Sequence, residues 1–375
     1  MSSKRTMNDE IKQMNRASIY RLFREQPALT RQDIVSSLGL CLPTVTKNVE
    51  ELMANGLIEI SGSKGYTGGR RAAYYSMVKD AKVALGVDIT LNHVTIVAVD
   101  LQGTIVASTR QRKRFENVDV YYRYVGNVLQ ELVQAADFKE DQILGVGIGL
   151  PVLVDADRKS ILFGKIIDLG DGAFENFSKY IPYQIRLYND ANAAAFTESW
   201  ASKETGNAFY LMLSNNVGGS MIIDGAVYSG DNQRSGEVGH VTLVPGGKPC
   251  YCGQRGCVDA YLAATNLSGL TEGNLQAFFE GVKAGEPTLV QEWEQYLEYL
   301  VSTVNTLRLL LDCDIILGGY VGEYLEPYLE TVRRKTVERN MFSANADYLR
   351  VCSYKKESIA AGAALNFVTE FLASI

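Results

Sequence analysis

One histidine and three cysteines stand close together in the second half of the chain, and side chains of these types bind metals. They are His240, Cys250, Cys252 and Cys257. Thiolate sulfur and imidazole nitrogen are ligands that Zn²⁺ prefers, and four of them complete a closed tetrahedral site of the structural kind. Gly253 and Gly256 allow the tight turn that directs the last two cysteines toward one ion. The spacing predicts one structural zinc ion; the alternative is three free thiols beside an unrelated histidine.

A second set of polar residues can form several hydrogen bonds. Asn189 and Asp190 are adjacent, and Glu237 lies shortly before His240. Carboxylates accept hydrogen bonds from hydroxyl groups, and an amide can both donate and accept them. The alternative for Asn189 and Asp190 is a helix N-cap, a position that both residue types favour.

The size and composition of the chain are those of a multidomain globular protein. It has 375 residues, of which 46% are hydrophobic and 21% charged, and this length implies two or three domains. The longest apolar stretch, residues 143–154, is interrupted by Pro151 and is too short to cross a bilayer. Residues 1–15 lack the apolar core of a signal peptide. We therefore expect a cytoplasmic protein with reduced thiols and no membrane partner.

Charge is distributed unevenly along the chain. Residues 1–79 contain 12 Lys+Arg and 7 Asp+Glu, a net charge of +5, whereas residues 80–375 contain 25 and 36, a net charge of −11. A basic head before an acidic body favours a nucleic-acid-binding module joined to a second domain. We place the domain boundary between residues 79 and 80.

The head is predicted to form three helices and a β-hairpin over residues 8–78. The apolar face of the first helix is expected to consist of Ile11, Met14, Ile19, Leu22 and Phe23. Thr30 can cap the second helix, Gly39 can form the turn after it, and Pro43 is tolerated in the first turn of the third.

The third helix and the hairpin carry the candidate DNA contacts. The residues expected to point outward near the start of the helix are Thr44, Thr46, Lys47 and Asn48. A recognition helix contacts bases and phosphates of the major groove at this position. Arg70 and Arg71, in the glycine-rich hairpin tip, suit the narrow and electronegative minor groove. The alternative is a small packing domain with no role in DNA binding.

The body contains a strand-rich pattern twice, at residues 83–108 and 208–230. This duplication resembles the two-lobed actin-like (ribonuclease H-like) α/β fold of sugar kinases. The zinc string at residues 237–259 and the Gly-Gly-Arg-Arg hairpin tip resemble those of the ROK family (repressors, open reading frames, kinases). The resemblance implies a winged helix-turn-helix over residues 1–79 and a ROK sugar-binding domain over residues 80–375.

The resemblance also implies roles for the polar residues. The string from Asn189 to Asn192 matches the family's Asn-Asp-Ala-Asn, whose aspartate is the catalytic base of the kinases. The sugar contacts implied in this way are Asn189, Asp190, Glu237, His240 and Asp259. His240 would bind zinc with one ring nitrogen and a sugar hydroxyl with the other. Asp259 stands where the family has glutamate, and Val152 stands where glycine is usual.

The two phosphate-binding loops of the family's kinases are altered in this chain. Residues 88–92 read Asp-Ile-Thr-Leu-Asn in place of Asp-x-Gly-Gly-Thr, and residues 214–219 read Ser-Asn-Asn-Val-Gly-Gly in place of Gly-Thr-Gly-x-Gly-Gly. Without these glycines the backbone cannot approach a phosphate as closely. We therefore expect a protein that is not an enzyme, in which Asp190 is a vestigial base.

The combined pattern predicts a sugar-responsive transcriptional repressor of carbohydrate-metabolism genes. Its expected partners are double-stranded operator DNA, a monosaccharide or sugar derivative, and further copies of itself in a homodimer or homotetramer. One alternative is an ATP-dependent sugar kinase with Asp190 as the catalytic base. The other is a scaffold that binds a sugar or a protein and has lost DNA binding, which the intact arginines of the hairpin tip disfavour.

Overall fold

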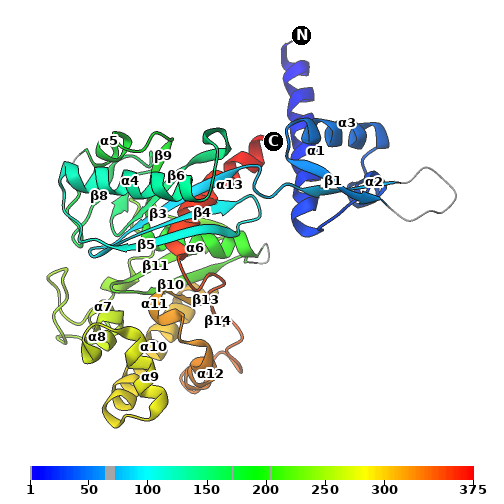
Figure 1. Ribbon diagram of the computed structural model, residues 1–375. Helices are drawn as coiled ribbons and strands as arrows, with labels where there is room; N and C mark the ends of the chain where they lie inside the picture. Colours follow the sequence, from blue (N-terminus) through cyan, green and yellow to red (C-terminus); the bar gives the residue numbers. More distant parts are fainter. Residues whose placement is uncertain (1, 64–71, 171, 203–204) are drawn as a thin grey trace.

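The computed structural model describes residues 2–63, 72–170, 172–202 and 205–375 (Figure 1). A head formed by the N-terminal residues lies beside the C-terminal end of the last helix, next to a body of two lobes. The predicted minor-groove residues Arg70 and Arg71 lie outside the described residues.

The head has the predicted three helices and hairpin. Its elements are α1 (Ser2–Glu25), α2 (Arg31–Leu38), α3 (Leu42–Ala54), β1 (Ile58–Ser63) and β2 (Ala73–Met77), and the two strands are antiparallel. Thr30 caps α2 by accepting a hydrogen bond from the Asp33 amide, and Gly39 ends α2 with a φ of 66°. Pro43 lies in the first turn of α3. These local predictions are confirmed.

Two details of the predicted head are wrong. Ile11 and Met14 of α1 are exposed, because the first half of this helix extends beyond the core that Ile19 and Phe23 enter. Asn48 is buried instead of facing outward, and its side-chain amide donates to the Thr44 carbonyl oxygen at 2.8 Å. That bond satisfies a polar group that the packing of α3 removes from water.

The first lobe is a five-stranded sheet in the order β5-β4-β3-β6-β9. Its strands are β3 (Val83–Ile89), β4 (His93–Asp100), β5 (Ile105–Arg112), β6 (Ile143–Leu150) and β9 (Ile185–Asn189). The three strands from β3 to β5 are antiparallel, whereas β6 and β9 run parallel to β3. Helices α4 (Asp119–Ala135) and α5 (Ala173–Ser178) and a small hairpin, β7 (Leu153–Val154) with β8 (Ile161–Phe163), complete this lobe.

The second lobe repeats this arrangement in the order β12-β11-β10-β13-β14. Its strands are β10 (Ala208–Leu213), β11 (Val217–Ile223), β12 (Ala226–Tyr228), β13 (Asp314–Gly318) and β14 (Leu349–Val351). Its helices are α7 (Asp259–Leu262), α8 (Ala264–Ser268), α9 (Leu275–Ala284), α10 (Pro287–Leu311), α11 (Gly319–Gly322) and α12 (Leu329–Val337). The predicted two-lobed α/β fold is confirmed.

Two helices, α6 (Asp190–Ala201) and α13 (Ser358–Ser374), join the lobes by packing against each other. Helix α13 lies on the sheet of the first lobe, and α6 contacts β10, β11 and β12 of the second. A Cβ atom added to Gly362 of α13 would lie 1.7 Å from the carbonyl oxygen of Ala193 in α6. The two backbones therefore meet at a distance that only glycine allows. None of the helices in the described parts of the chain is long and apolar enough to cross a membrane.

Candidate ligand cleft and metal cluster

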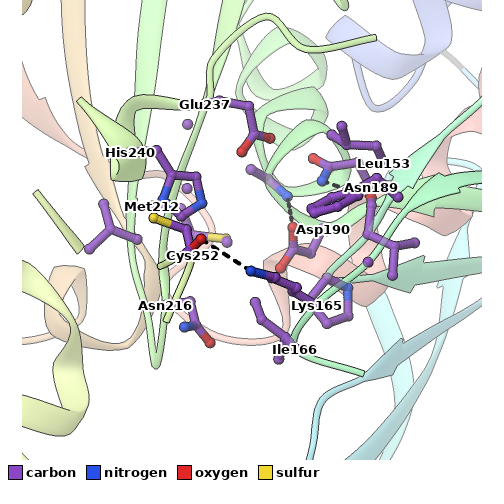
Figure 2. Close-up of a pocket in the computed structure, with 18 of the residues that line it drawn as sticks. Leu153, Lys165, Ile166, Asn189, Asp190, Met212, Asn216, Glu237, His240 and Cys252 are labelled. Atoms are coloured by element: carbon purple, nitrogen blue, oxygen red, sulfur yellow. Dashed lines mark hydrogen bonds between the residues drawn. The ribbon is translucent and has the colours of Figure 1, made fainter. Parts of the chain in front are cut away.

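A cavity lies between the lobes at the start of α6 (Figure 2). The first lobe contributes the β7–β8 hairpin and the end of β9, and the second contributes β10, β11 and the loop from Glu237 to Cys252. Of the predicted sugar-binding residues, the cavity wall contains Asn189, Asp190, Glu237 and His240. The fold thus brings together polar groups from both lobes, so that a ligand bound here would contact each lobe.

The first two polar residues are held by the strand-to-helix junction. Asn189 caps α6, since its Oδ1 accepts a hydrogen bond from the Asn192 amide at 3.0 Å, and its Nδ2 donates to the Val152 carbonyl oxygen at 3.1 Å. Oδ1 of Asp190 accepts from the Ala191 amide at 2.8 Å. Among the described residues no donor reaches its second oxygen. The N-cap alternative is therefore true of Asn189, while Asp190 keeps an oxygen free for a ligand.

The carboxyl group of Asp190 is poorly hydrated. The pKa of Asp190 is raised to about 7, mainly by burial and also by the nearby carboxylates of Asp88 and Glu237, against the opposing effect of the Ala191 amide. Loss of water disfavours the charged form of an acid, and like charges add to that effect. Near neutral pH, Asp190 can therefore either accept or donate a hydrogen bond to a hydroxyl group.

Three polar residues that the sequence analysis did not assign to the ligand site also line the cavity. Lys165, just after β8, reaches across the cavity and donates from Nζ to the Cys252 carbonyl oxygen at 3.1 Å (Figure 2). Asn216 and Tyr251 line it from the second lobe. A lysine in a loop has no local sequence signal for such a contact, because its partner is 87 residues away along the chain.

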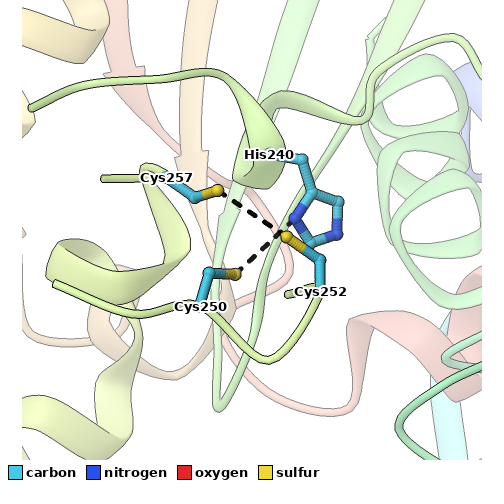
Figure 3. A group of neighbouring side chains, drawn as sticks. All are labelled: His240, Cys250, Cys252 and Cys257. Atoms are coloured by element: carbon cyan, nitrogen blue, oxygen red, sulfur yellow. Dashed lines mark hydrogen bonds between the residues drawn. The ribbon is translucent and has the colours of Figure 1, made fainter. Parts of the chain in front are cut away.

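The predicted metal ligands converge at one point (Figure 3). The ligand atoms of His240, Cys250, Cys252 and Cys257 all lie within 4.8 Å of one another. Sγ of Cys252 is 3.8 Å from Sγ of Cys257, and Sγ of Cys250 is 3.8 Å from Nδ1 of His240. A tetrahedral site with Zn–S bonds of about 2.3 Å has sulfur atoms about 3.8 Å apart. The cluster therefore has the composition and the spacing to hold a metal ion.

The second nitrogen of His240 has a partner within the protein. Nε2 lies 3.2 Å from the hydroxyl oxygen of Tyr251, and the two rings meet edge to face. A residue of this kind orients a metal-binding histidine through its outer nitrogen. The contact between His240 and a sugar hydroxyl stays a prediction, with Tyr251 placed beside the nitrogen that would make it.

Asp259 lies behind the cavity wall and not on it. It is buried at the start of α7, where its Oδ1 accepts a hydrogen bond from the Val217 amide at 2.7 Å. The cavity contains Val217 but not Asp259 among its lining residues. A ligand contact of Asp259 stays a prediction. The observed bond holds the start of β11 against the loop that carries the cysteine cluster.

The altered phosphate loops form a neighbouring cavity between the lobes. Leu91 and Asn215 line it, together with Tyr320 of α11. The guanidinium carbon of Arg110, on β5 of the first lobe, lies 5.6 Å from the centroid of the Tyr320 ring. Side chains from both lobes thus meet beside this cavity.

The predicted major-groove residues lie on the first turns of α3. Lys47 is exposed and its Nζ is 4.0 Å from Oε1 of Glu51, whereas Thr44 and Thr46 are half-buried. The Thr44 hydroxyl lies 3.0 Å from Sγ of Cys41, which precedes the helix. A role for these three residues in DNA binding stays a prediction.

Residues 84–369 match the ROK family. The xylose repressor of Bacillus subtilis is 27% identical over 263 residues, which cover 68% of this chain and 67% of that protein. The N-acetylglucosamine repressor of Escherichia coli O6:H1 is 26% identical over 260 residues, which cover 68% and 64%. A crystal structure of a ROK family transcriptional regulator, a homologue of the E. coli MLC protein, matches over 97% of both chains, with a TM-score of 0.73 and 20% identity. This last likeness shows that the fold is shared along almost the whole chain.

We predict that replacing Asp190 changes how stability depends on pH. Its native pKa of about 7 exceeds that of an unfolded aspartate. The stability that protonation contributes is therefore complete below pH ~4 and is lost as the pH rises through 7. Asp190→Asn cannot ionise, so between pH 5 and pH 8 it should gain roughly 1–3 kcal/mol relative to the unmodified chain. Urea unfolding at each pH measures this difference.

Asp157→Asn is the control for this measurement. Hydrogen bonds from the Lys159 and Ser160 amides lower the pKa of Asp157, so its contribution changes only at pH values below those used. Identical pH profiles for Asp190→Asn and the unmodified chain would show that Asp190 titrates normally.

Proposed function

Because the chain belongs to the ROK family, we propose that it is a sugar-responsive transcriptional repressor. The head would bind operator DNA through α3 and the hairpin, and the cleft would bind a monosaccharide or a derivative of one. The two repressors that resemble it are named for different sugars, so the proposal extends to the class of ligand and not to one member. Two heads are needed to read two half-sites, which a homodimer or homotetramer would supply.

The observation that carries this proposal is a contact between the head and the helix that begins at the cleft. Helix α6 starts with Asp190, and Trp200 is its eleventh residue. The guanidinium carbon of Arg24, near the end of α1, lies 3.9 Å from the centroid of the Trp200 ring. A ligand that draws the lobes together would move α6 relative to the first lobe. The contact between Trp200 and Arg24 would transmit this movement to the head. Ligand binding would then change the affinity of the head for DNA.

The alternative function, phosphoryl transfer by a sugar kinase, has less support in this chain. Leu91 and Asn215 stand in the two loops that contact phosphates in the family's kinases, and Tyr320 lines the same cavity. Larger residues replace the glycines of both loops, so their backbone amides cannot approach a phosphate as closely. The kinase alternative keeps one favourable observation, the free oxygen of Asp190. Release of ADP that depends on sugar and disappears in Asp190→Asn would establish the kinase.

We also propose that the cluster at His240 holds a structural Zn²⁺. The ion would fix the loop that carries Glu237, Tyr251 and the carbonyl group that Lys165 contacts. Metal binding is coupled to folding of such a loop, because the ligands come together only in the folded loop and the ion stabilises that arrangement. The support for zinc is the donor set of three sulfurs and one nitrogen together with its spacing.

We predict DNA binding that depends strongly on salt. Fluorescence anisotropy of the full chain should detect tighter binding to DNA upstream of its own or neighbouring sugar genes than to random duplex. Lys47→Gln should weaken both and reduce the slope of log affinity against log salt by about one unit, because one phosphate contact is lost. Thr46→Ala should mainly reduce the preference for the upstream sequence. Lys82→Gln, in the body, is the control. Absence of any salt-sensitive DNA binding would refute the repressor.

We predict one zinc ion per chain by elemental analysis. Cys252→Ser removes one ligand and should lower the zinc content well below one, and it should also weaken monosaccharide binding because the loop loses its order. Cys41→Ser is the matched control, since Cys41 lies in the head, far along the chain from the cluster. Equal zinc content in both variants would contradict the assignment.

We predict that Trp200→Ala separates sugar binding from DNA release. Calorimetry should find monosaccharide affinity within about twofold of the unmodified chain, because Trp200 is distant from Asp190 along α6. The ratio of DNA affinities with and without sugar should fall toward one, whereas couplings of about 5-fold to 150-fold are usual in such proteins. Arg21→Ala removes an exposed cation of the same helix as Arg24 and serves as the control. An unchanged ratio in Trp200→Ala would rule out this route.

A further inference from the structure

A second cavity of about 460 Å³ lies beside α6, behind Asn189. Its walls come from the turn after β7, from β9, from β12 of the second lobe, from α6 and from α13. It therefore spans the two lobes, as the ligand cleft does, and the two cavities share Asn189.

The cavity contains one cation, the guanidinium group of Arg158. Its central carbon lies 4.5 Å from the centroid of the Tyr188 ring, and Nη1 donates to Oδ1 of Asn366 at 3.3 Å. These two contacts orient the group without neutralising it. No carboxylate in the described part of the chain comes within ion-pair distance of Arg158. Asp155 also lines the cavity, and its Oδ1 accepts from the Ala156 amide.

The backbone of Arg158 is held in an unusual conformation. Its φ is 58°, in the left-handed region that side chains other than glycine, asparagine and aspartate rarely adopt. The carbonyl oxygen of Arg158 accepts a hydrogen bond from the Leu187 amide at 2.9 Å, and its amide donates to the Asp155 carbonyl oxygen at 2.9 Å. Strain of this kind persists where the surroundings hold a side chain in place, and here they hold the guanidinium over the cavity.

An acceptor without a partner also lies in the wall of this cavity. Oδ1 of Asn192, on the first turn of α6, is buried and has no hydrogen-bond partner among the described residues. A buried polar atom in this state costs free energy, which a hydroxyl group of a ligand would recover by donating to it. Gln233 supplies a further amide to the wall.

We propose that this cavity is a second ligand site, which takes a small hydroxylated anion, a phosphate monoester or a carboxylate. Arg158 would bind the anionic group, since a guanidinium is suited to both oxyanions. The hydroxyl group next to it would donate to Asn192. This cavity lies next to a third one, between α6 and the head, whose walls include Arg24 and Trp200. Phe196 lines both cavities. An anion here would contact α6 between the sugar cleft and the head.

Calorimetry on the full chain at constant ionic strength tests the proposal with three probes that differ in one group. These are glycerol 3-phosphate, glycerate and glycerol. We expect at least one of the two anions to bind and glycerol not to bind, and comparison of the two anions identifies the preferred oxyanion. Failure of both anions to bind would overturn the proposal, and it would leave the sugar and DNA predictions standing.

Variants then locate the binding. Arg158→Asn removes the cation and keeps a residue type that tolerates a φ of 58°, so it should weaken the anion at least tenfold while the fold is preserved. Arg158→Lys should retain part of the affinity, and Asn192→Ala should weaken it severalfold. Lys159→Gln removes the exposed cation next to Arg158 and should leave the affinity unchanged.

The sugar cleft is the competing location. Glu237→Ala alters that cleft and should not change anion binding in the second cavity. Loss of anion binding in Glu237→Ala but not in Arg158→Asn would place the anion in the cleft and overturn the second site.

Discussion

The close contact between α6 and α13 is the constraint on which the rest of the body depends. Gly362 lets the backbone of α13 approach Ala193, and Gly86 and Gly147 let the first sheet approach α13 in the same way. The lobes are thus joined through helices rich in alanine and glycine. Their short side chains let the backbones pack closely, and a larger side chain would not fit at this junction. The cleft, the second cavity and the contact with the head all lie along α6, so their relative positions follow from this junction.

The cleft has an acidic side chain on one side and a basic side chain on the other. Asp190 is held where burial favours its neutral form, and Lys165 closes the other side through the Cys252 carbonyl oxygen. The metal cluster lies directly behind that carbonyl group, and the Val217 amide bound by Asp259 lies on the same wall. A change in the loop that carries the cysteine cluster would therefore also change the wall of the cleft.

In this chain the ROK fold has altered forms of the two loops that contact phosphates in the family's kinases. The two sheets and the two central helices can close on a ligand whether or not a nucleotide is present, because closure depends on groups that face each other across the cleft. Arg110 and Tyr320 join the lobes beside the altered loops by a cation–π contact. Under the proposed function, movement of the lobes is what this arrangement would transmit to the head.

The sequence by itself determined the elements and the metal cluster, because both depend on neighbours along the chain. Strands β3 and β10 begin at residues 83 and 208, where the two strand-rich patterns start, Thr30 and Gly39 bound α2, and the four candidate metal ligands need only one loop to meet. Tertiary structure decided which side chains face a ligand. Lys165, Tyr251 and Arg158 carry no motif, Asp259 turns to a backbone amide, and Asn48 turns inward. The direction of each depends on a partner whose position only the packing of the lobes and helices sets.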